Sequence, residues 1–132
     1  MESSKAAEQL ENWMQEVLTY HMKDPGRAIK ACAEIENYAQ KCQDSENLAF
    51  AYFYSGECYY FLNEISSMIG QMTNAVVYLS LSNQWELLAR AQNLLGITMA
   101  NRGNIPVALD YYLTGIKTCR EHNVTTIICS IH

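Results

Sequence analysis

The residues best able to bind a metal or to form disulfides are five cysteines and three histidines. They are Cys32, Cys42, Cys58, Cys119, Cys129, His21, His122 and His132. The cysteines are odd in number and widely spaced, without a CxxC pair, whereas zinc sites and disulfide frameworks need closer, paired spacing. Each histidine is isolated from any cluster with ligand spacing. We therefore predict no metal and no cofactor. We expect the cysteines to be small apolar core residues of an intracellular protein, with a regulatory or labile thiol as the alternative.

The sequence also lacks the motifs of catalytic and phosphate-binding sites. It contains no GxSxG, HExxH, P-loop or GxGxxG pattern, and no nucleophile has an evident base. Nine Lys and Arg against 14 Asp and Glu give a net charge of −5, so no dense basic patch faces a phosphate backbone. The most apolar stretch, 75–81, is far shorter than the roughly 20 residues of a membrane span. We predict a non-enzymatic, cytoplasmic protein that binds neither nucleic acid nor membrane.

Helix-breaking residues divide the chain at regular intervals. Breaks at 23–26, 43–45, 62–64, 82–84, 102–104 and 122–123 lie about 20 residues apart. Between them, apolar residues recur every three or four positions, as in Leu87, Leu88, Ala91, Leu94, Leu95 and Met99. No segment alternates with period two long enough to form a strand. The sequence predicts an all-α chain with helices over 4–22, 25–43, 45–62, 65–82, 84–102, 105–122 and 124–132.

The breaks and the residues between them repeat with a period of about 40 residues. The matched pairs are Glu46 and Glu86, Leu48 and Leu88, Ala49 and Ala89, Ala51 and Ala91, Gly56 and Gly96, and Ile65 and Ile105. We therefore divide the single domain, 1–132, into repeats at 4–43, 44–83 and 84–123. A fourth repeat begins at 124–132, and we expect it to be truncated there. A repeated helix pair implies a solenoid, because each pair buries its apolar face on the next.

The third repeat carries the most specific motif. Its residues are Leu95-Gly96-x-x-Met99, then Gly103-Asn104-Ile105, Ala108 and Tyr112. This pattern resembles the tetratricopeptide repeat, which has Leu-Gly and a Tyr in its first helix (helix A), then a Gly-Asp/Asn turn. Its second helix (helix B) follows with Ala and an aromatic residue. Gly56 and Gly96 would let helix A approach helix B closely.

The other two repeats depart from this motif. The second keeps Gly56, Tyr59, Ile65 and Ala75 but has Met68 and Met72 where Ala and an aromatic residue are usual; the first keeps Ala28 but has Glu16 in place of the glycine. The period is also longer than the standard of about 34 residues. The repeat with this longer period is similar to the long-helix tetratricopeptide repeat of bacterial signalling proteins. A HEAT-like repeat is the alternative. The resemblance implies a right-handed α-α superhelix of three helix pairs plus a partial seventh helix.

In tetratricopeptide arrays the A helices line the concave surface. Mapped onto this sequence, the inner positions are Trp13, Val17, Phe50, Phe53, Glu57, Tyr60, Arg90, Asn93, Ile97 and Asn101. The set mixes aromatic with hydrogen-bonding groups, as a peptide-binding or ligand-binding groove does. The alternative is that Phe50, Phe53 and Tyr60 pack against a neighbouring repeat or a second copy.

The resemblance favours a sensory or interaction module that binds a peptide or protein segment. It is similar to the N-terminal tetratricopeptide regions of bacterial diguanylate cyclases with a GGDEF output domain, and to peptide-responsive quorum-sensing regulators. No Gly-Gly-Asp-Glu-Phe signature occurs here, so cyclase activity would belong to the parent protein. The alternative is a structural scaffold or dimerisation arm without a ligand, in which exposed aromatic residues form a homodimer interface.

Overall fold

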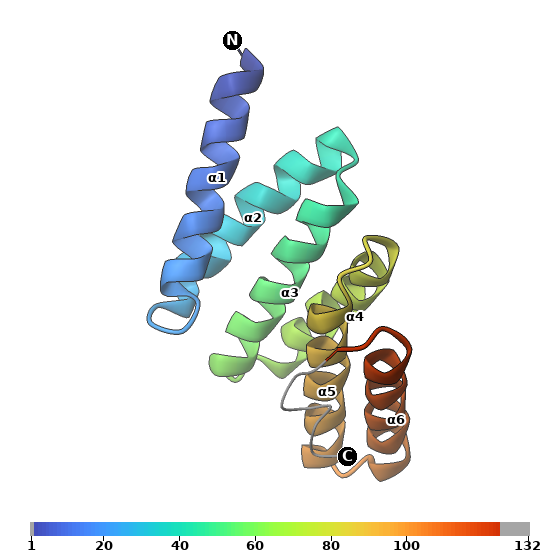
Figure 1. Ribbon diagram of the computed structural model, residues 1–132. Helices are drawn as coiled ribbons and strands as arrows, with labels where there is room; N and C mark the ends of the chain where they lie inside the picture. Colours follow the sequence, from blue (N-terminus) through green and yellow to red (C-terminus); the bar gives the residue numbers. More distant parts are fainter. Residues whose placement is uncertain (1, 125–132) are drawn as a thin grey trace.

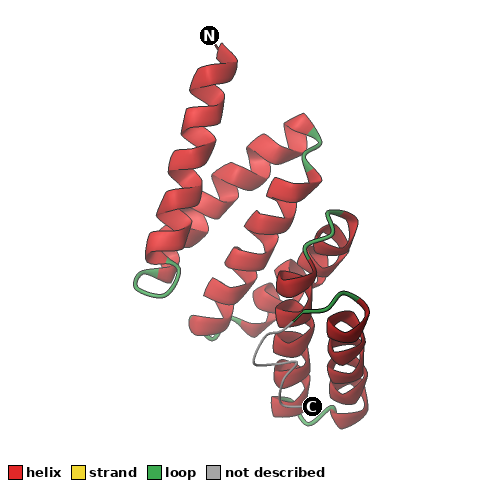
Figure 2. Ribbon diagram, in the orientation of Figure 1, coloured by secondary structure: helices red, strands yellow, loops and turns green. Residues whose placement is uncertain are grey.

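The computed structural model describes residues 2–124 of the chain, with side chains from Lys5 onward. These residues form six α-helices and no strand (Figure 2). The helices are α1 (Glu2–Tyr20), α2 (Pro25–Cys42), α3 (Ser45–Phe61), α4 (Ile65–Leu81), α5 (Trp85–Asn101) and α6 (Ile105–Glu121). The predicted all-α class is confirmed, and the predicted ends of these helices differ from the observed ones by at most two residues. The seventh helix, expected at 124–132, falls outside the described residues except for Val124.

A left-handed residue ends each helix from α2 to α6. These residues are Gln43, Asn63, Asn83, Gly103 and Asn123, with φ of 53°, 58°, 58°, 81° and 54°. Glycine and asparagine are the residues that tolerate this conformation best. In each case the next N–H reaches back to a carbonyl five residues earlier, as from Glu64 to Tyr59 at 2.9 Å and from Val124 to Cys119 at 3.0 Å. The turns after α2 to α6 therefore share one helix-ending motif, which reverses the chain in three residues.

Side-chain caps start three of the helices. Asp24 accepts from the Arg27 N–H, Asp44 from the Asn47 N–H, and Asn104 from the Val107 N–H, at 3.2–3.4 Å. Pro25 and Pro106 lie in the first turns of α2 and α6, where a missing N–H breaks no helical bond.

Each helix packs chiefly against its neighbours in the sequence (Figure 1). α1, α3 and α5 run in one direction, and α2, α4 and α6 return between them. The most extensive contact joins α3 to α4 and forms the main core. Its largest fully buried side chains include Phe53, Met68, Met72, Leu79 and Leu95. No helix within 2–124 is long and apolar enough to cross a membrane.

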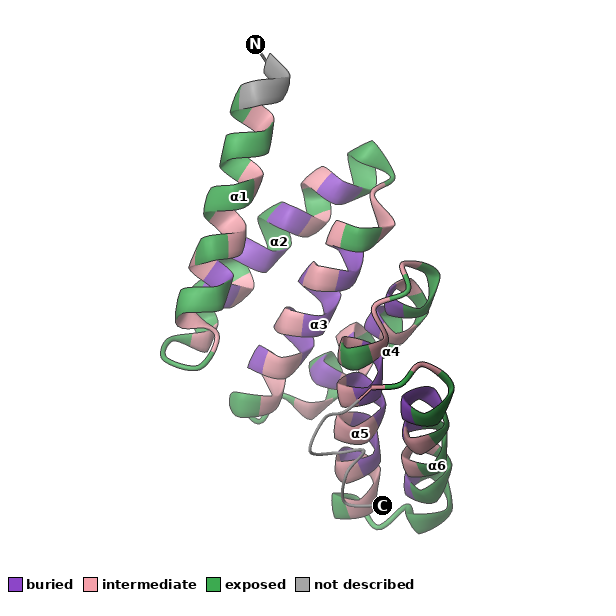
Figure 3. Cartoon of the chain, in the orientation of Figure 1, coloured by how far each residue is buried: buried purple, intermediate pink, exposed green. Residues whose placement is uncertain are grey.

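The pattern of burial repeats with the period of the sequence. α2 buries Ala28, Cys32, Ile35 and Ala39, and α4 buries Met68, Met72, Ala75 and Leu79, which lie 40 positions later. α3 and α5 share buried positions in the same way, at Leu48 and Leu88, Ala49 and Ala89, Ala51 and Ala91, and Gly56 and Gly96. Figure 3 shows that the buried residues face neighbouring helices, while the outer sides of α1 and α6 are exposed. Equivalent residues of successive helix pairs therefore have equivalent surroundings.

Close contact within a helix pair explains the glycines of α3 and α5. A Cβ on Gly96 would lie 2.7 Å from the Tyr112 ring, and one on Gly56 would lie 3.0 Å from the Met72 methyl. The first pair differs, because Glu16 occupies the equivalent position and accepts a hydrogen bond from Arg27 Nε at 2.6 Å. The Glu16 side chain thus makes an ion pair between α1 and α2 at the position where the later pairs have a glycine that packs closely against Met72 or Tyr112.

Candidate binding face of helices α1, α3 and α5

Glu57 lies at the centre of the face formed by the odd-numbered helices. Its Oε1 is 2.9 Å from Nδ1 of His21, in the turn after α1, and its Oε2 is 3.3 Å from a terminal nitrogen of Arg90 on α5. The Glu57 side chain is 14% exposed. One carboxylate therefore joins all three helix pairs, and its partners satisfy the charge that burial would otherwise leave unpaired.

Aromatic rings surround this carboxylate. Tyr54 meets the His21 ring edge-on, with centroids 5.2 Å apart, and packs on Phe50 at 4.7 Å and on Phe53 at 5.1 Å. The guanidinium of Arg90 lies 5.1 Å from the centroid of Phe53, within range of a cation–π interaction. Burial raises the pKa of Tyr54, and the positive charge of Arg90 opposes that shift. The network therefore accounts for three of the aromatic residues between 50 and 61, namely Phe50, Phe53 and Tyr54, whereas Tyr52 stacks on Tyr78 of α4.

The structure brings together four of the predicted groove residues: Phe50, Phe53, Glu57 and Arg90. Phe53 is only 1% exposed, so it forms the base beneath the face and leaves the contact with solvent to its neighbours. Trp13 and Phe50 both pack against a second core cluster, which is formed by residues of α1, α2 and α3. Val17, mapped to the same inner row, is fully buried in that cluster.

The remaining predicted residues lie toward the C-terminal ends of α3 and α5. Asn93 and Ile97 are half-buried on α5, and the Asn93 amide makes no hydrogen bond to any described residue. Tyr60 and Asn101 line a cleft of about 480 Å³ between the ends of the two helices. Its other lining residues are Phe61, Asn63, Ile65, Thr98 and Arg102. Of the predicted set, only Tyr60 and Asn101 therefore lie at this cleft, and Asn93 and Ile97 belong neither to it nor to the Glu57 network.

Sequence reasoning missed His21, Tyr54 and Arg102. In the sequence His21 has no nearby carboxylate partner, because Glu57 is 36 positions away. The 40-residue period could have indicated His21, because His21 lies two periods before Asn101. Asn101 is one of the inner positions predicted from the tetratricopeptide pattern. Arg102 was overlooked because it lies just after α5, outside the helical positions that were mapped.

Cys58, His21 and Glu57 lie close together on this face and are the residue types that a thiol catalyst uses. Cys58 lies beside Glu57, but its Sγ is 3.8 Å from the backbone carbonyl of His21, to which the thiol donates weakly. The thiol is fully buried, and burial, aided by the nearby Glu57 charge, raises the pKa of Cys58 to about 12. A nucleophilic cysteine needs the opposite shift. The thiol is therefore an inert core group.

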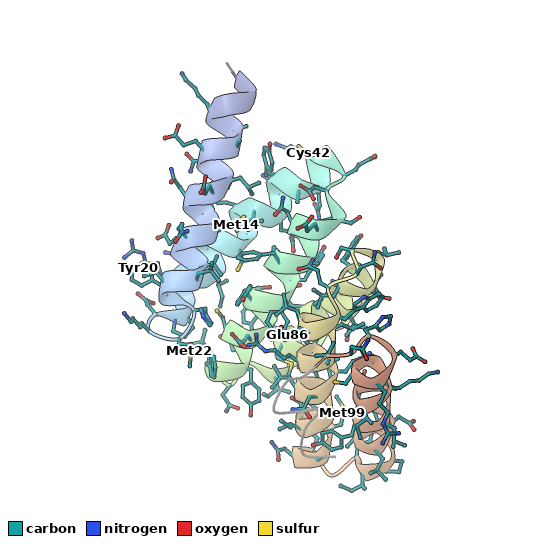
Figure 4. The ribbon with its side chains drawn as sticks, in the orientation of Figure 1. Met14, Tyr20, Met22, Cys42, Glu86 and Met99 are labelled. Atoms are coloured by element: carbon teal, nitrogen blue, oxygen red, sulfur yellow. The ribbon has the colours of Figure 1, made fainter. Side chains whose placement is uncertain are left out.

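The other cysteines and the polar clusters give no sign of a metal centre. Cys32 is buried and free, as expected, whereas Cys42 is exposed at the end of α2 (Figure 4), so the expectation of a core position is wrong for Cys42. Cys119 is buried but forms a disulfide, so the expectation of an unpaired core cysteine is wrong there. Cys129 lies outside the described residues. Within 2–124, no group of His, Cys, Asp and Glu could hold a metal ion.

Comparisons of the chain with models of protein families, with curated proteins and with solved structures find no match.

Proposed function

We propose that this chain is a non-catalytic module that binds a peptide or protein segment along the face of α1, α3 and α5. The observation that carries the proposal is the arrangement of half-exposed aromatic, amide and guanidinium groups on two parallel helices, α3 and α5, that ends in a cleft. Such groups recognise the main chain and the apolar side chains of an extended segment.

We also propose that the helix pairs form a right-handed tetratricopeptide-type superhelix. Identical turns, contacts mainly between sequence neighbours, and burial that repeats every 40 residues support this architecture. A constant step from one pair to the next generates a curved array. In that arrangement α1, α3 and α5 line the concave side.

By its resemblance to long-helix tetratricopeptide regions, the module is the cytoplasmic regulatory part of a larger bacterial signalling protein, such as a GGDEF diguanylate cyclase. A peptide-responsive quorum-sensing regulator is the related possibility. In either case the chain itself acts as a receptor, and the catalytic or DNA-binding output belongs to another part of the protein.

A second candidate is a scaffold or dimerisation arm. The observation in its favour is the exposed apolar surface of α6, where Ile105, Leu109 and Leu113 are each more than half exposed. This surface lies on the last described helix pair, away from the Glu57 network.

A double variant tests the receptor function. Asn93 and Asn101 make no hydrogen bond to a described residue, so Asn93→Ala with Asn101→Ala removes no internal contact of residues 2–124. Linear peptides selected from a random display library on the wild-type chain should bind the double variant at least about tenfold more weakly, since two hydrogen bonds are lost. The melting temperature should stay within about 2 °C of the wild type.

Two results would count against the receptor function. If the library yields no peptide with saturable binding, the face is not a receptor surface. If the double variant unfolds early without ligand, the asparagines are structural and the scaffold function is favoured. Asn74, exposed on α4 and remote from the face, provides the control variant Asn74→Ala.

A further inference from the structure

The cysteine in the last turn of α6 is bonded, in contrast to the other cysteines of the described residues. Cys119 forms a disulfide, whereas Cys32, Cys42 and Cys58 are free thiols. The chain has five cysteines, so the one that remains to pair with Cys119 is Cys129. A bond between the two closes the short loop 119–129. It connects α6, the last described helix, to the residues that follow it in the sequence.

The 40-residue period of the sequence explains why these two positions come together. The positions equivalent to Cys119 and Cys129 in the earlier repeats are Ala39 with Ala49 and Leu79 with Ala89. All four equivalents are fully buried, and the first two lie in one core cluster. Both positions thus belong to the surface through which a B helix packs on the next A helix. At the third occurrence of this pair of positions, the two residues are cysteines.

The residues after α6 also have the apolar pattern of a helix that packs on its predecessor. Ile128 and Ile131 follow Leu88 and Ala91 by 40 positions. Leu88 and Ala91 of α5 lie in the main core together with Leu79 of α4. The sequence after α6 is therefore suited to pack on α6 in the way that α5 packs on α4.

The end of α6 holds Cys119 in a defined place for this contact. The Val124 N–H donates to the Cys119 carbonyl at 3.0 Å, and the His122 ring stacks on Trp85 of α5 with centroids 3.6 Å apart. Within 2–124, α6 packs chiefly against α5. The side of its last turns that a following helix would cover therefore has no other helix of the described chain upon it.

The free thiols indicate which kind of disulfide this is. Cys42 is both exposed and free. Disulfides that form in oxidising compartments are permanent structural bonds, and exposed thiols there are normally paired. Disulfides in reducing compartments are transient and respond to the redox state. A chain that combines an exposed free thiol with one disulfide fits the second case.

We propose that the disulfide between Cys119 and Cys129 is a redox-controlled strap that holds the residues from Thr125 onward against α6. In the oxidised chain this segment occupies the place of the next A helix and covers the last turns of α6. Reduction releases the segment and uncovers that surface. The strap goes beyond the proposed receptor function and is independent of it, because Cys119 lies on α6, outside the face of α1, α3 and α5.

Reduction of the strap is a thiol–disulfide exchange with a dithiol, or with two molecules of a monothiol such as glutathione. A thiolate of the reductant attacks one sulfur of the protein disulfide, which breaks that bond and forms a mixed disulfide. A second thiolate of the reductant then displaces the protein sulfur. Both cysteines end as thiols, with two electrons and two protons from the reductant, which leaves as its own disulfide. Cys119 lies in the last turn of α6, where local opening costs least, so the exchange does not require the whole chain to unfold.

Peptide mapping tests the pairing. The chain is equilibrated with oxidised glutathione, alkylated and digested without reduction. Trypsin cleaves after Lys117 and Arg120, which places the two cysteines in the separate peptides 118–120 and 121–132. We expect these peptides to be recovered as one disulfide-linked species that separates on reduction. Recovery of Cys119 in alkylated form, or linked to a different cysteine, overturns the proposal.

Hydrogen exchange of the complete chain tests the strap itself. Amides of 116–124 should exchange at least about tenfold more slowly in the oxidised chain than in a glutathione buffer at the reducing poise of the cytosol, whereas amides of α3 should not change. Cys129→Ser should exchange like the reduced wild type in both buffers. Cys42→Ser, which removes a free thiol from the exposed end of α2, is the matched control and should respond as the wild type does.

Two results of the exchange experiment would overturn the strap. Equal exchange at 116–124 in the two redox states would mean that the bond does not hold the segment against α6. Persistence of the disulfide in the reducing glutathione buffer would make it a permanent structural bond. Neither result bears on peptide binding by the face of α1, α3 and α5, so the receptor function is tested separately.

Discussion

At the scale of single residues, Glu57 has the most far-reaching contacts. It receives hydrogen bonds from the turn after α1 and from α5, so it links helices that hardly touch through their backbones. Replacing it by Ala leaves Arg90 and His21 without their acceptor in a half-buried setting. We expect Glu57→Ala to lower the free energy of unfolding by about 1–3 kcal/mol.

Urea denaturation measures this effect, with Glu34→Ala as the control. Glu34 is exposed on α2 and pairs with no described residue, so its removal should change stability by no more than about 0.5 kcal/mol. Equal losses in the two variants would mean that the network does not join the helix pairs.

The buried thiols and phenols predict loss of stability at alkaline pH. Burial raises the pKa of Cys58 from its ordinary value of 9.0 to about 12, and it also raises the pKa of Cys32 and of Tyr54. Above about pH 9 the unfolded chain loses these protons while the folded chain keeps them. The free energy of unfolding should therefore fall as the pH rises from about 9 toward 12, and this contribution should be constant below pH 9.

Urea denaturation from about pH 8 to about pH 11 measures the slope. Cys58→Ala should give a shallower fall, because one proton fewer separates the two states. Asn74→Ala, which removes no titratable group from the exposed side of α4, is the control and should keep the wild-type slope. An unchanged slope in the Cys58 variant would show that this thiol ionises in the folded protein as it does in the unfolded one.

At the scale of helices, the contact between α5 and α6 depends on Gly96. Any side chain there meets the Tyr112 ring, which blocks a Cβ at 2.7 Å. Gly96→Leu should destabilise the protein by about 1–3 kcal/mol through overpacking, visible as a lower melting temperature. Gly70 provides the matched control, because a Cβ there has nothing within 4 Å. Gly70→Ala should raise stability by about 0.5–1 kcal/mol, and a Gly96 variant that melts like the wild type would contradict the observed packing.

Helix boundaries could be predicted because their signals are local. Asp24 with Pro25, and Gly103 with Asn104, mark ends and starts through short-range hydrogen bonds and a left-handed φ. The faces of the helices were harder to assign. α3 is buried against helices on both sides, so apolar periodicity does not distinguish Phe53, in the core, from Phe50, on the face.

The site was predictable only in part, for the same reason. The A-helix mapping found Glu57 and Arg90, whose helical positions repeat, but gave no reason to pair them with each other. The partner of Glu57 in the first helix pair, His21, follows the end of α1, and the cleft cation, Arg102, follows the end of α5. Residues just beyond a helix have no periodicity to reveal which face they join.

At the scale of the whole molecule, the two ends of the helical array differ in polarity. The outer side of α1 is rich in exposed polar residues, whereas α6 exposes Leu109 at 53% and Leu113 at 62% (Figure 3). In α4 the position equivalent to Leu109 is Ile69, which is half-buried and packs against the main core. No helix within 2–124 covers the corresponding side of α6.

An uncovered apolar side of this kind predicts that the isolated chain self-associates. Terminal repeats of helical arrays need a polar outer face to remain monomeric in solution, and a net charge of −5 opposes association only weakly at physiological ionic strength. Sedimentation velocity at micromolar concentration should detect dimers of the wild type. Leu109→Glu with Leu113→Glu should restore the monomer with little change in melting temperature, because both side chains already face solvent in the monomer. Val77→Glu, at a 52% exposed position on α4, is the control and should leave the dimer intact. A monomeric wild type would exclude the α6 face as a self-interface and would remove the observation that favours the scaffold function.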